Sequence, residues 1–226
     1  MHPQMPLLLK LREDFNFGNF IAGDNQLILD SLEKPSEPFV FLWGDKGTGK
    51  THLLQAACQH QTQQGKTAAY LALKELSNTS TQLLAGMEHI DFVCIDDIDA
   101  VSEQVDWEEA LFNLFNQIKP LGGHLVISSN TSPKHSSVKL KDLRSRLNSG
   151  LPLNLHALND ENTIKALQIR AKKLGLELNQ DVARFILTRF PRDLNTLWGL
   201  INQLDSASLA AQRKLTIPFV KLTLLS

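Results

Sequence analysis

Residues Gly44 to Thr51 read GDKGTGKT, and this octapeptide restricts the possible folds more than any other part of the sequence. It matches the pattern G-x-x-x-x-G-K-[ST] of phosphate-binding loops. The β-rich run FVFLW over 39–43 precedes it, and helical spacing of apolar residues over 51–64 follows it. A strand that leads through such a loop into a helix is the context that the pattern requires. We therefore predict a βα unit whose loop binds the phosphates of a nucleotide.

The residue types in this loop suit that role. Gly47 and Gly49 permit backbone conformations that turn successive N–H groups inward at a helix N-terminus, where phosphate oxygens are bound. We expect Lys50 to reach the β- and γ-phosphates and Thr51 to offer its hydroxyl to Mg²⁺. The alternative is a glycine-rich turn with an exposed lysine. The predicted nucleotide-binding residues of the loop are Gly44, Asp45, Lys46, Gly47, Thr48, Gly49, Lys50, Thr51 and His52.

Two later strands are predicted to end in polar residues. VCID over 93–96 is an apolar run that leads into further carboxylates, and ligands of open α/β sheets bind at the carboxyl ends of the strands. We expect Asp96 to bind Mg²⁺ through water and Asp97 to orient or activate the attacking water. Asp99 is interpreted as solvated or as a cap of the following loop. Asn130, at the end of the next strand, is a candidate to hydrogen-bond the γ-phosphate or the lytic water, although such an Asn is otherwise a turn residue.

Strand-like and helix-like segments alternate over the first two thirds of the chain. The predicted strands are 39–43, 68–73, 92–95, 125–127 and 151–155, and the predicted helices between them are 51–64, a short stretch that ends near 86, and 107–119. This alternation indicates βαβ units, and hence an α/β fold with a mainly parallel five-stranded sheet that is covered on both faces. We assign this nucleotide-binding domain to residues 13–158.

From about residue 159 the pattern is helical throughout. Three amphipathic segments, over 160–174, 181–189 and 192–211, predict a small helical domain over 159–226. Asp160 and Asn179 are expected N-caps and Gly175 an expected C-cap. Pro191 suits the first turn of a helix, so we expect Arg192 to project from a fixed helix start.

Composition narrows the class of protein further. The net charge is −1 and the pI is about 6.7, which argues against strong DNA binding by the chain itself. No apolar stretch approaches the ~18 residues of a membrane span. Cys58 and Cys94 lie in apolar surroundings without metal-ligand spacing, and we expect both to be reduced core residues. The prediction is a cytoplasmic protein without membrane contact.

An apolar peptide, QMPLLL over 4–9, stands near the N-terminus. Pro6 favours extended geometry at Met5, so the segment over 1–12 is predicted to be extended. A secretory signal does not fit, because the run is short, has no basic leader and is followed at once by charged residues. The alternatives for the peptide are a partner-binding segment, a frayed terminus, or a segment packed on its own domain.

The motifs, taken in order, resemble those of the AAA+ ATPases and, within them, the bacterial replication initiator DnaA. The resemblance covers roughly 15–205 and depends on NFIAG over 19–23, the phosphate-binding loop, IDDI over 95–98, SSN over 128–130, SR over 145–146 and PRDL over 191–194. It implies a three-layer αβα core with a helical lid, bound ADP or ATP, and Mg²⁺ held by Thr51 and Asp96. It further implies an adenine pocket at Phe20, Ile21, Ala22 and Gly23, Asn130 as sensor 1, Arg192 as sensor 2, and Arg146 as an arginine finger offered to a neighbouring subunit. From residue chemistry alone, Arg146 would instead belong to a solvated helix face.

The sequence departs from DnaA at both ends. The 214–224 segment is too short for the helix-turn-helix domain of DnaA, and the peptide 4–9 stands where DnaA has a larger region. In this the chain resembles the regulatory inactivators of DnaA. That resemblance implies a negative regulator of replication initiation that stimulates ATP hydrolysis by DnaA. It also implies that the protein contacts DNA mainly indirectly, through the polymerase sliding clamp. A homo-oligomer is a further possibility. The peptide would dock on the clamp in extended form, and the residues assigned to this contact are Gln4, Met5, Leu7, Leu8 and Leu9.

Two other functions stay open at this point. A self-sufficient ATPase such as a helicase loader is possible, because the residues for turnover, which include Lys50, Asp96 and Asp97, are all present. A small-molecule nucleotide kinase is disfavoured, because the segment after the core predicts a helical bundle with one well-placed arginine rather than an arginine-rich lid. We favour a regulatory co-activator over an enzyme with independent turnover.

Overall fold

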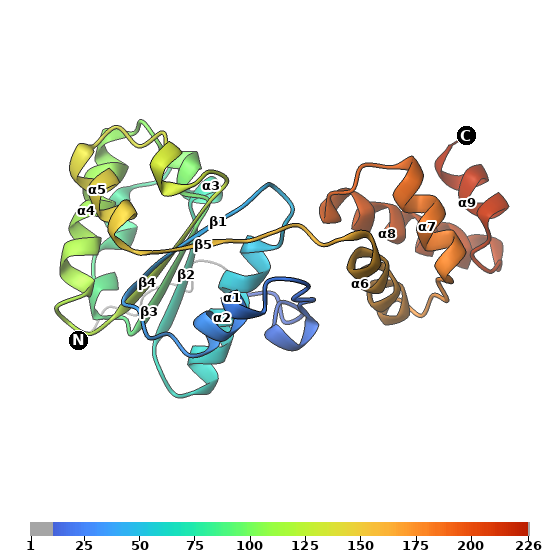
Figure 1. Cartoon of the computed structure of the whole chain (residues 1–226), viewed down its shortest axis with the longest axis horizontal. Coiled ribbons are helices and arrows are strands. Elements are labelled where there is room, and N and C mark those ends of the chain that lie inside the picture. Colours follow the sequence, from blue (N-terminus) through green and yellow to red (C-terminus); the bar gives the residue numbers. More distant parts are fainter. Residues whose placement is uncertain (1–10, 226) are drawn as a thin grey trace. The chain divides into compact units, whose positions relative to one another are not determined.

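The computed structural model describes residues 11–225 of the chain. Within this range the chain divides into two compact units, one made of residues up to 156 without 46–48, and the other made of 46–48 with 157–225. Figure 1 shows both units coloured along the sequence, and each is described by itself below.

The first unit is built on a parallel five-stranded sheet, as predicted. Its strands are β1 (Phe39–Trp43), β2 (Ala68–Ala72), β3 (Phe92–Asp96), β4 (His124–Ser129) and β5 (Leu151–Asn154), in the order β2-β3-β4-β1-β5. All four neighbouring pairs are parallel. Trp43 pairs with Ser129 on one side and Asn154 on the other. The carboxyl ends of β1, β4 and β5 therefore meet at one edge, from which the phosphate-binding loop departs.

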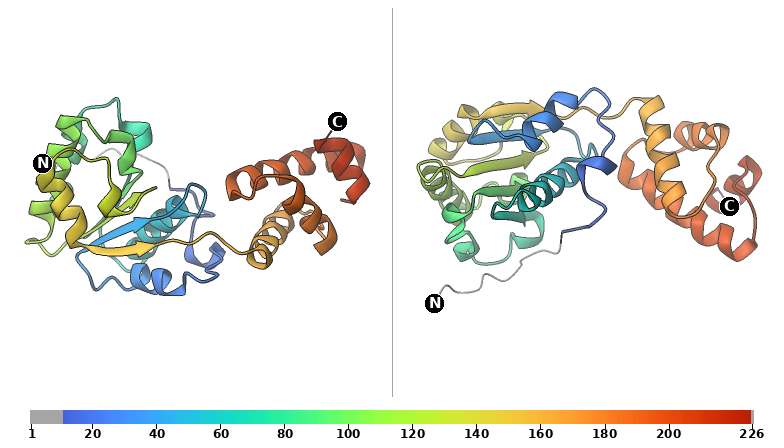
Figure 2. Two further views of the ribbon diagram at one scale, coloured as in Figure 1. Left: turned by 45° about the horizontal axis from the view of Figure 1, so that its top comes forward. Right: turned by 90° about the horizontal axis from the view of Figure 1, so that it is seen from below.

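Helices cover both faces of this sheet (Figure 2). They are α1 (Gln26–Glu33), α2 (Lys50–Gln63), α3 (Leu73–Leu76), α4 (Val105–Ile118) and α5 (Lys141–Ser149), with short 3-10 turns between them. Successive side chains of a strand point to opposite faces: Phe41 joins the core with α4 and α5, whereas Val40 and Leu42 join the core with α1 and α2. The result is the three-layer αβα arrangement that the sequence predicted.

Two helices of this unit were not predicted. In α1 the buried residues are Ile28, Leu29 and Leu32, which form a short apolar stripe. In α5 only Leu143 and Leu147 are buried, one turn apart, and the rest is polar. Segments this short depend on tertiary packing for stability, because isolated helices of fewer than ~12 residues are marginal in water.

The second unit is a bundle of four helices. They are α6 (Asp160–Lys173), α7 (Gln180–Arg189), α8 (Leu194–Ala211) and α9 (Ile217–Leu224). Their buried apolar residues form one core that includes Leu167, Ile186, Ile201 and Val220. The last helix was not among the three helical segments that the sequence predicted for this domain. The side chain of Thr216 caps it by accepting a hydrogen bond from the N–H of Phe219.

The helix ends of this bundle agree only in part with the predictions. Asn179 is the N-cap of α7, as predicted, but Asn159 rather than Asp160 caps α6. The expectation that Arg192 projects from the start of a helix is wrong. The N-cap of α8 is Asp193, whose carboxylate accepts a hydrogen bond from the N–H of Thr196. An N-cap side chain satisfies an N–H group that the helix itself leaves unpaired, so this aspartate fixes the helix start two residues after Pro191.

Cys58 and Cys94 are free thiols in the core of the first unit, as predicted. Burial raises the pKa of the Cys94 thiol. None of the helices in residues 11–225 combines the length and the apolarity that a bilayer span requires.

Candidate nucleotide-binding site

The loop between β1 and α2 has the backbone that its glycines predict. Gly47 has φ +85° and Gly49 has φ +104°, in the left-handed region that favours glycine. A Cβ on Gly49 would also lie 2.8 Å from Cε2 of Phe20. Helix α2 begins directly afterwards, at Lys50. Free N–H groups at such a helix start, together with the positive end of its dipole, favour a bound phosphate.

Lys50 lies under this loop and is only 6% exposed. Its Nζ donates to the backbone oxygens of Gly44 (2.8 Å) and Asp45 (3.1 Å) and to Oδ1 of Asn130 (3.1 Å). An ammonium group has three donors, so these acceptors match it fully. Burial lowers the pKa of Lys50, while nearby carboxylates, chiefly Asp97, act in the opposite direction. The structure thus places a buried cation where the sequence predicted contact with the phosphates.

Two of the predicted carboxylates lie at the carboxyl end of β3. Asp96 is 2% exposed, and its oxygens accept hydrogen bonds from the hydroxyl of Tyr70 (2.8 Å) and from the hydroxyl of Ser128. Asp97 has a left-handed backbone (φ 58°, ψ 58°), and its N–H donates to Oγ of Ser128 at 2.9 Å. Burial raises the pKa of Asp97, and the neighbouring Asp96 raises it further. Burial, and then Asp96, also raise the pKa of Tyr70.

Asp99 was expected to be solvated or to cap the following loop, but its carboxylate binds residues at the end of β4. Its Oδ1 accepts from Oγ of Ser129 (2.7 Å), and its Oδ2 accepts from the backbone N (2.6 Å) and Nδ2 (2.9 Å) of Asn130. The 3-10 turn Ile98–Val101 brings the carboxylate back to the end of β4. Asp99 therefore fixes the orientation of Asn130, and the D-x-D spacing was the only sequence signal for it.

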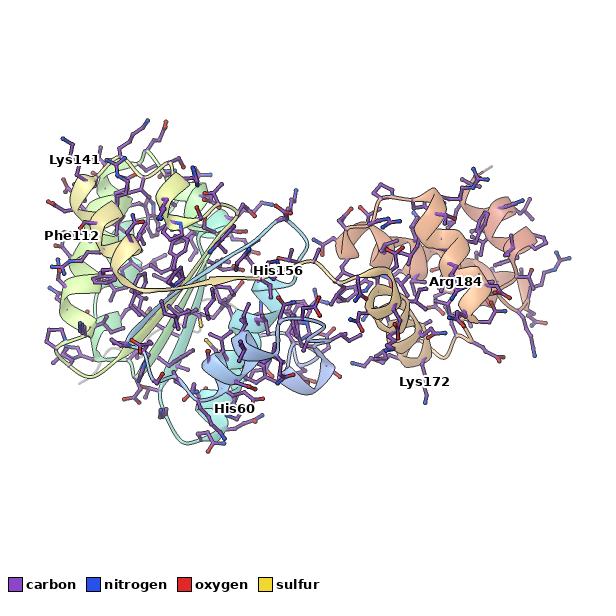
Figure 3. All side chains as sticks on the ribbon, in the orientation of Figure 1. His60, Phe112, Lys141, His156, Lys172 and Arg184 are labelled. Atoms are coloured by element: carbon purple, nitrogen blue, oxygen red, sulfur yellow. The ribbon has the colours of Figure 1, made fainter. Side chains whose placement is uncertain are left out.

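The segment that contains Phe20, Ile21, Ala22 and Gly23 passes the first turn of α2. The Phe20 ring meets His52 edge-on, with centroids 5.3 Å apart, and Phe15 stacks on the same imidazole at 4.6 Å. Sequence reasoning missed Asn25, which follows this segment and is 3% exposed. Its Nδ2 donates to the backbone oxygens of Ala22 and His156, and its Oδ1 accepts from the N–H of His156. His156 follows β5 and is labelled in Figure 3, so Asn25 joins the predicted adenine-binding segment to the end of β5.

The two predicted functional arginines come from other elements of the chain. Arg146 lies in the last turn of α5 and is exposed, and its Cζ is 5.7 Å from the ring centroid of Phe115. Arg192 belongs to the second unit, where its Nη1 pairs with Oδ1 of Asp160 at 2.8 Å. The predicted clamp-binding residues Gln4, Met5, Leu7, Leu8 and Leu9 lie outside the described residues.

The residues of the site suit Mg²⁺ bound together with a nucleotide. Thr51 lies in the first turn of α2, and Asp96 has two oxygens that each accept one hydrogen bond and retain further acceptor capacity. No group of three or more His, Cys, Asp or Glu side chains that could hold a metal occurs within 11–225. Mg²⁺ does not require such a group, because it is commonly bound by one or two carboxylates, by phosphates and by several waters.

The order of the sheet, the loop after β1 and the helical lid place the chain among the AAA+ proteins, and comparisons with known proteins define its branch. A family model described as the bacterial DnaA ATPase domain matches residues 11–154, and one described as the Hda lid domain matches residues 160–224. The chain therefore belongs to the DnaA-like AAA+ family, with a lid of the Hda type. An uncharacterized protein of Haemophilus influenzae is 45% identical over 98% of both chains.

Solved structures show the same fold at low sequence identity. Domain III of the Thermotoga maritima replication initiation protein DnaA matches with a TM-score of 0.84 and 23% identity, over 96% of this chain and 98% of that chain. AMPPCP-bound DnaA from Aquifex aeolicus matches with 0.71 and 23%, over 85% and 65%. The Thermotoga maritima RuvB Holliday junction branch migration motor matches with 0.69 and 17%, over 97% and 72%.

Proposed function

We propose that this protein is a nucleotide-bound regulator that stimulates ATP hydrolysis by DnaA in trans, and so restrains the initiation of replication. The observation that carries the proposal is the position of Arg146. It is exposed on α5, and no carboxylate among residues 11–225 forms an ion pair with it. A guanidinium that is not engaged in such an ion pair is available to a triphosphate on a second molecule. An arginine supplied in this way increases the rate of phosphoryl transfer by about 10³–10⁵.

The partner is proposed from the family. The ATPase domain is of the DnaA type, and the lid is of the Hda type. Association of two DnaA-like chains would present the α5 of one to the nucleotide of the other. The same family relation supports the alternative that the chain also associates with copies of itself.

The chain's own site is proposed to hold ADP or ATP with Mg²⁺, and the AMPPCP-bound DnaA supports an adenine nucleotide. The N–H groups of the loop would bind the phosphates, and the Lys50 ammonium would exchange at least one of its three protein acceptors for a phosphate oxygen. Phe20 to Gly23 would contact the base. The metal would neutralise phosphate charge and would be held by Thr51 and by Asp96. Asp97 and Asn130 would face the γ-phosphate end of the site, and Arg192 would contact the phosphates from the lid.

The test is a hydrolysis assay of ATP-bound DnaA in the presence of DNA-loaded sliding clamp. Arg146→Ala is expected to lower the stimulated rate by at least about 10²-fold. Arg146→Lys should rescue little, because an ammonium lacks the planar, bidentate donors of guanidinium. Arg144→Ala is the matched control, because Arg144 is also exposed on α5. Full stimulation by Arg146→Ala would overturn the proposal.

Docking on the clamp is proposed for the peptide 4–9 and has its own test. Clamp immobilised on beads should retain the wild-type protein but not the Gln4→Ala or Leu7→Ala variants. Neighbouring side chains of an extended peptide point to opposite sides, so Leu8→Ala should weaken retention less than Leu7→Ala. Equal retention of all the variants would exclude this peptide as the docking segment.

A self-sufficient ATPase, such as a helicase loader, remains the second candidate. It is supported by the close approach of Lys50, Asp97 and Asn130 at one edge of the sheet. Steady-state phosphate release by the purified protein separates the two functions. Robust turnover without DnaA and clamp would favour the ATPase, whereas release that depends on both would favour the regulator.

A further inference from the structure

Tyr70 is the only tyrosine of the chain, and it lies on β2 beside the carboxylate assigned to Mg²⁺. Tyr70 is 9% exposed, and its hydroxyl donates to Oδ2 of Asp96 at 2.8 Å. In the sheet register Tyr70 pairs with Cys94, two residues before Asp96. Alternate residues of a strand share a face, so Cys94 and Asp96 point to the same side of β3, the side covered by α2.

Ser128 holds the same carboxylate from the other neighbouring strand. It lies on β4, is 0% exposed, and donates its hydroxyl hydrogen to Oδ1 of Asp96. Its oxygen also accepts the N–H of Asp97 at 2.9 Å. Both oxygens of Asp96 are thus bound by donors from opposite sides, which fixes the rotation of the carboxylate about its Cβ–Cγ bond.

We propose that Tyr70 is a positioning residue for Mg²⁺–nucleotide binding, which acts through Asp96. The hydroxyl occupies one acceptor direction of Oδ2 and leaves the remaining directions of the carboxylate for the hydration shell of the metal. Groups that orient a metal-binding side chain in this way usually change metal affinity about 10- to 100-fold when they are removed. The inference rests on the proposed role of Asp96, and it adds a residue that no motif of the sequence indicated.

The first test compares wild-type protein with Tyr70→Phe, which keeps the ring and removes the hydroxyl. The affinity for ADP is measured at increasing Mg²⁺ concentrations and, separately, in EDTA. In Tyr70→Phe, the Mg²⁺ concentration that gives half of the maximal increase in ADP affinity is expected to rise about 10-fold or more. The ADP affinity in EDTA should be the same in the variant and in wild type. Cys58→Ala is the control for a loss of packing, because Cys58 lies in the same core as Tyr70. It should lower the unfolding temperature without moving the Mg²⁺ midpoint.

An equal Mg²⁺ midpoint in Tyr70→Phe and wild type overturns the inference. Asp96→Asn shows which assignment has failed. If Asp96→Asn moves the midpoint and Tyr70→Phe does not, only the role of Tyr70 is wrong. If neither variant moves it, the assignment of Asp96 to the metal is wrong as well.

A spectroscopic measurement on the wild-type chain tests the hydrogen bond of Tyr70 without a substitution. With tyrosine labelled by ¹³C at Cζ, the wild-type chain gives one resonance, because it has one tyrosine. The shift of this carbon follows the hydrogen bond of the hydroxyl. We expect it to move when Mg²⁺ is added to the ADP-bound protein and to return with EDTA. A resonance that is the same in both conditions would overturn the inference.

Discussion

Nζ of Lys50 lies 3.1 Å from Oδ1 of Asn130, and this hydrogen bond joins the phosphate-binding loop to the end of β4. Nδ2 of the same asparagine donates to Oδ2 of Asp99 at 2.9 Å. The amide therefore turns its oxygen to a cation and its nitrogen to an anion, which is the orientation that both charges favour. Lysine, asparagine and aspartate form a chain from the loop to the 3-10 turn after β3.

Asn130→Ala is predicted to change the preference of the site between ATP and ADP. Asn130 is proposed to contact the γ-phosphate, which ADP lacks, so ADP should lose little affinity. One lost hydrogen bond to a charged group corresponds to about a tenfold weaker binding of ATP. Competition of ATP and ADP for a fluorescent nucleotide measures the ratio. Thr131→Ala, at the next exposed position, is the control, and an unchanged ratio in Asn130→Ala would contradict the prediction.

The parts of this site that the sequence predicted are local in the chain. The loop, its glycines and Lys50 form one octapeptide, and the strand that precedes it is a continuous apolar run. A parallel strand covered on both faces has this pattern, so both the strand and its burial on both faces follow from neighbouring residues.

The parts that the sequence did not predict depend on pairs that are distant in the chain. Tyr70 and Asp96 are 26 residues apart, and Asn25 and His156 are 131 residues apart. An isolated Tyr or Asn in an ordinary sequence does not indicate which residue it will meet, because the register of the sheet decides this. Asp99 was misjudged for the same reason, since its partners lie on β4.

Asp97→Asn is predicted to stabilise the fold at neutral pH. The folded-state pKa of Asp97 is raised from 3.8, first by burial and then by Asp96. Between 3.8 and that raised pKa the folded state binds more protons than the unfolded state, so the stabilising contribution is present at low pH and is lost as the pH rises. A neutral asparagine avoids this loss and also tolerates the left-handed backbone found at this position.

Urea unfolding at a series of pH values measures this effect. The variant should be more stable than wild type near pH 7, and the difference should shrink as the pH falls toward 3.8. Asp24→Asn, at an exposed position, is the control for the loss of a carboxylate. A difference between Asp97→Asn and wild type that is independent of pH would refute the assigned cause.

Glu108→Gln is predicted to loosen the start of α5, the helix that carries Arg146. The Glu108 carboxylate is 3% exposed and accepts from the backbone N–H groups of Glu103 (2.8 Å), Lys139 (3.0 Å) and Leu140 (2.6 Å). Leu140 is the residue directly before α5. A glutamine would turn an NH₂ group toward some of these donors, and leaving a buried donor unpaired costs about 1–3 kcal/mol.

The loss should appear in two measurements on Glu108→Gln. The free energy of unfolding in urea should fall by that amount, and the amide of Leu140 should exchange with solvent faster than in wild type. Glu109→Gln is the matched control on the exposed side of α4 and should stay within about 0.5 kcal/mol of wild type. Unchanged exchange at Leu140 would mean that the carboxylate does not hold the start of α5.

Arg192→Ala is predicted to weaken nucleotide binding without unfolding the lid. The ion pair of Arg192 with Asp160 is short, at 2.8 Å, but the two side chains are 65% and 62% exposed. Exposed pairs contribute about 0–1 kcal/mol, so the bundle should keep its stability. If the guanidinium binds phosphate, its removal should weaken ADP binding about tenfold or more, as for a charge-assisted hydrogen bond. Asp160→Ala breaks the same ion pair and leaves the arginine, so it should not weaken binding. Equal losses in the two variants would show that the ion pair rather than the arginine is needed, and would remove Arg192 from the nucleotide site.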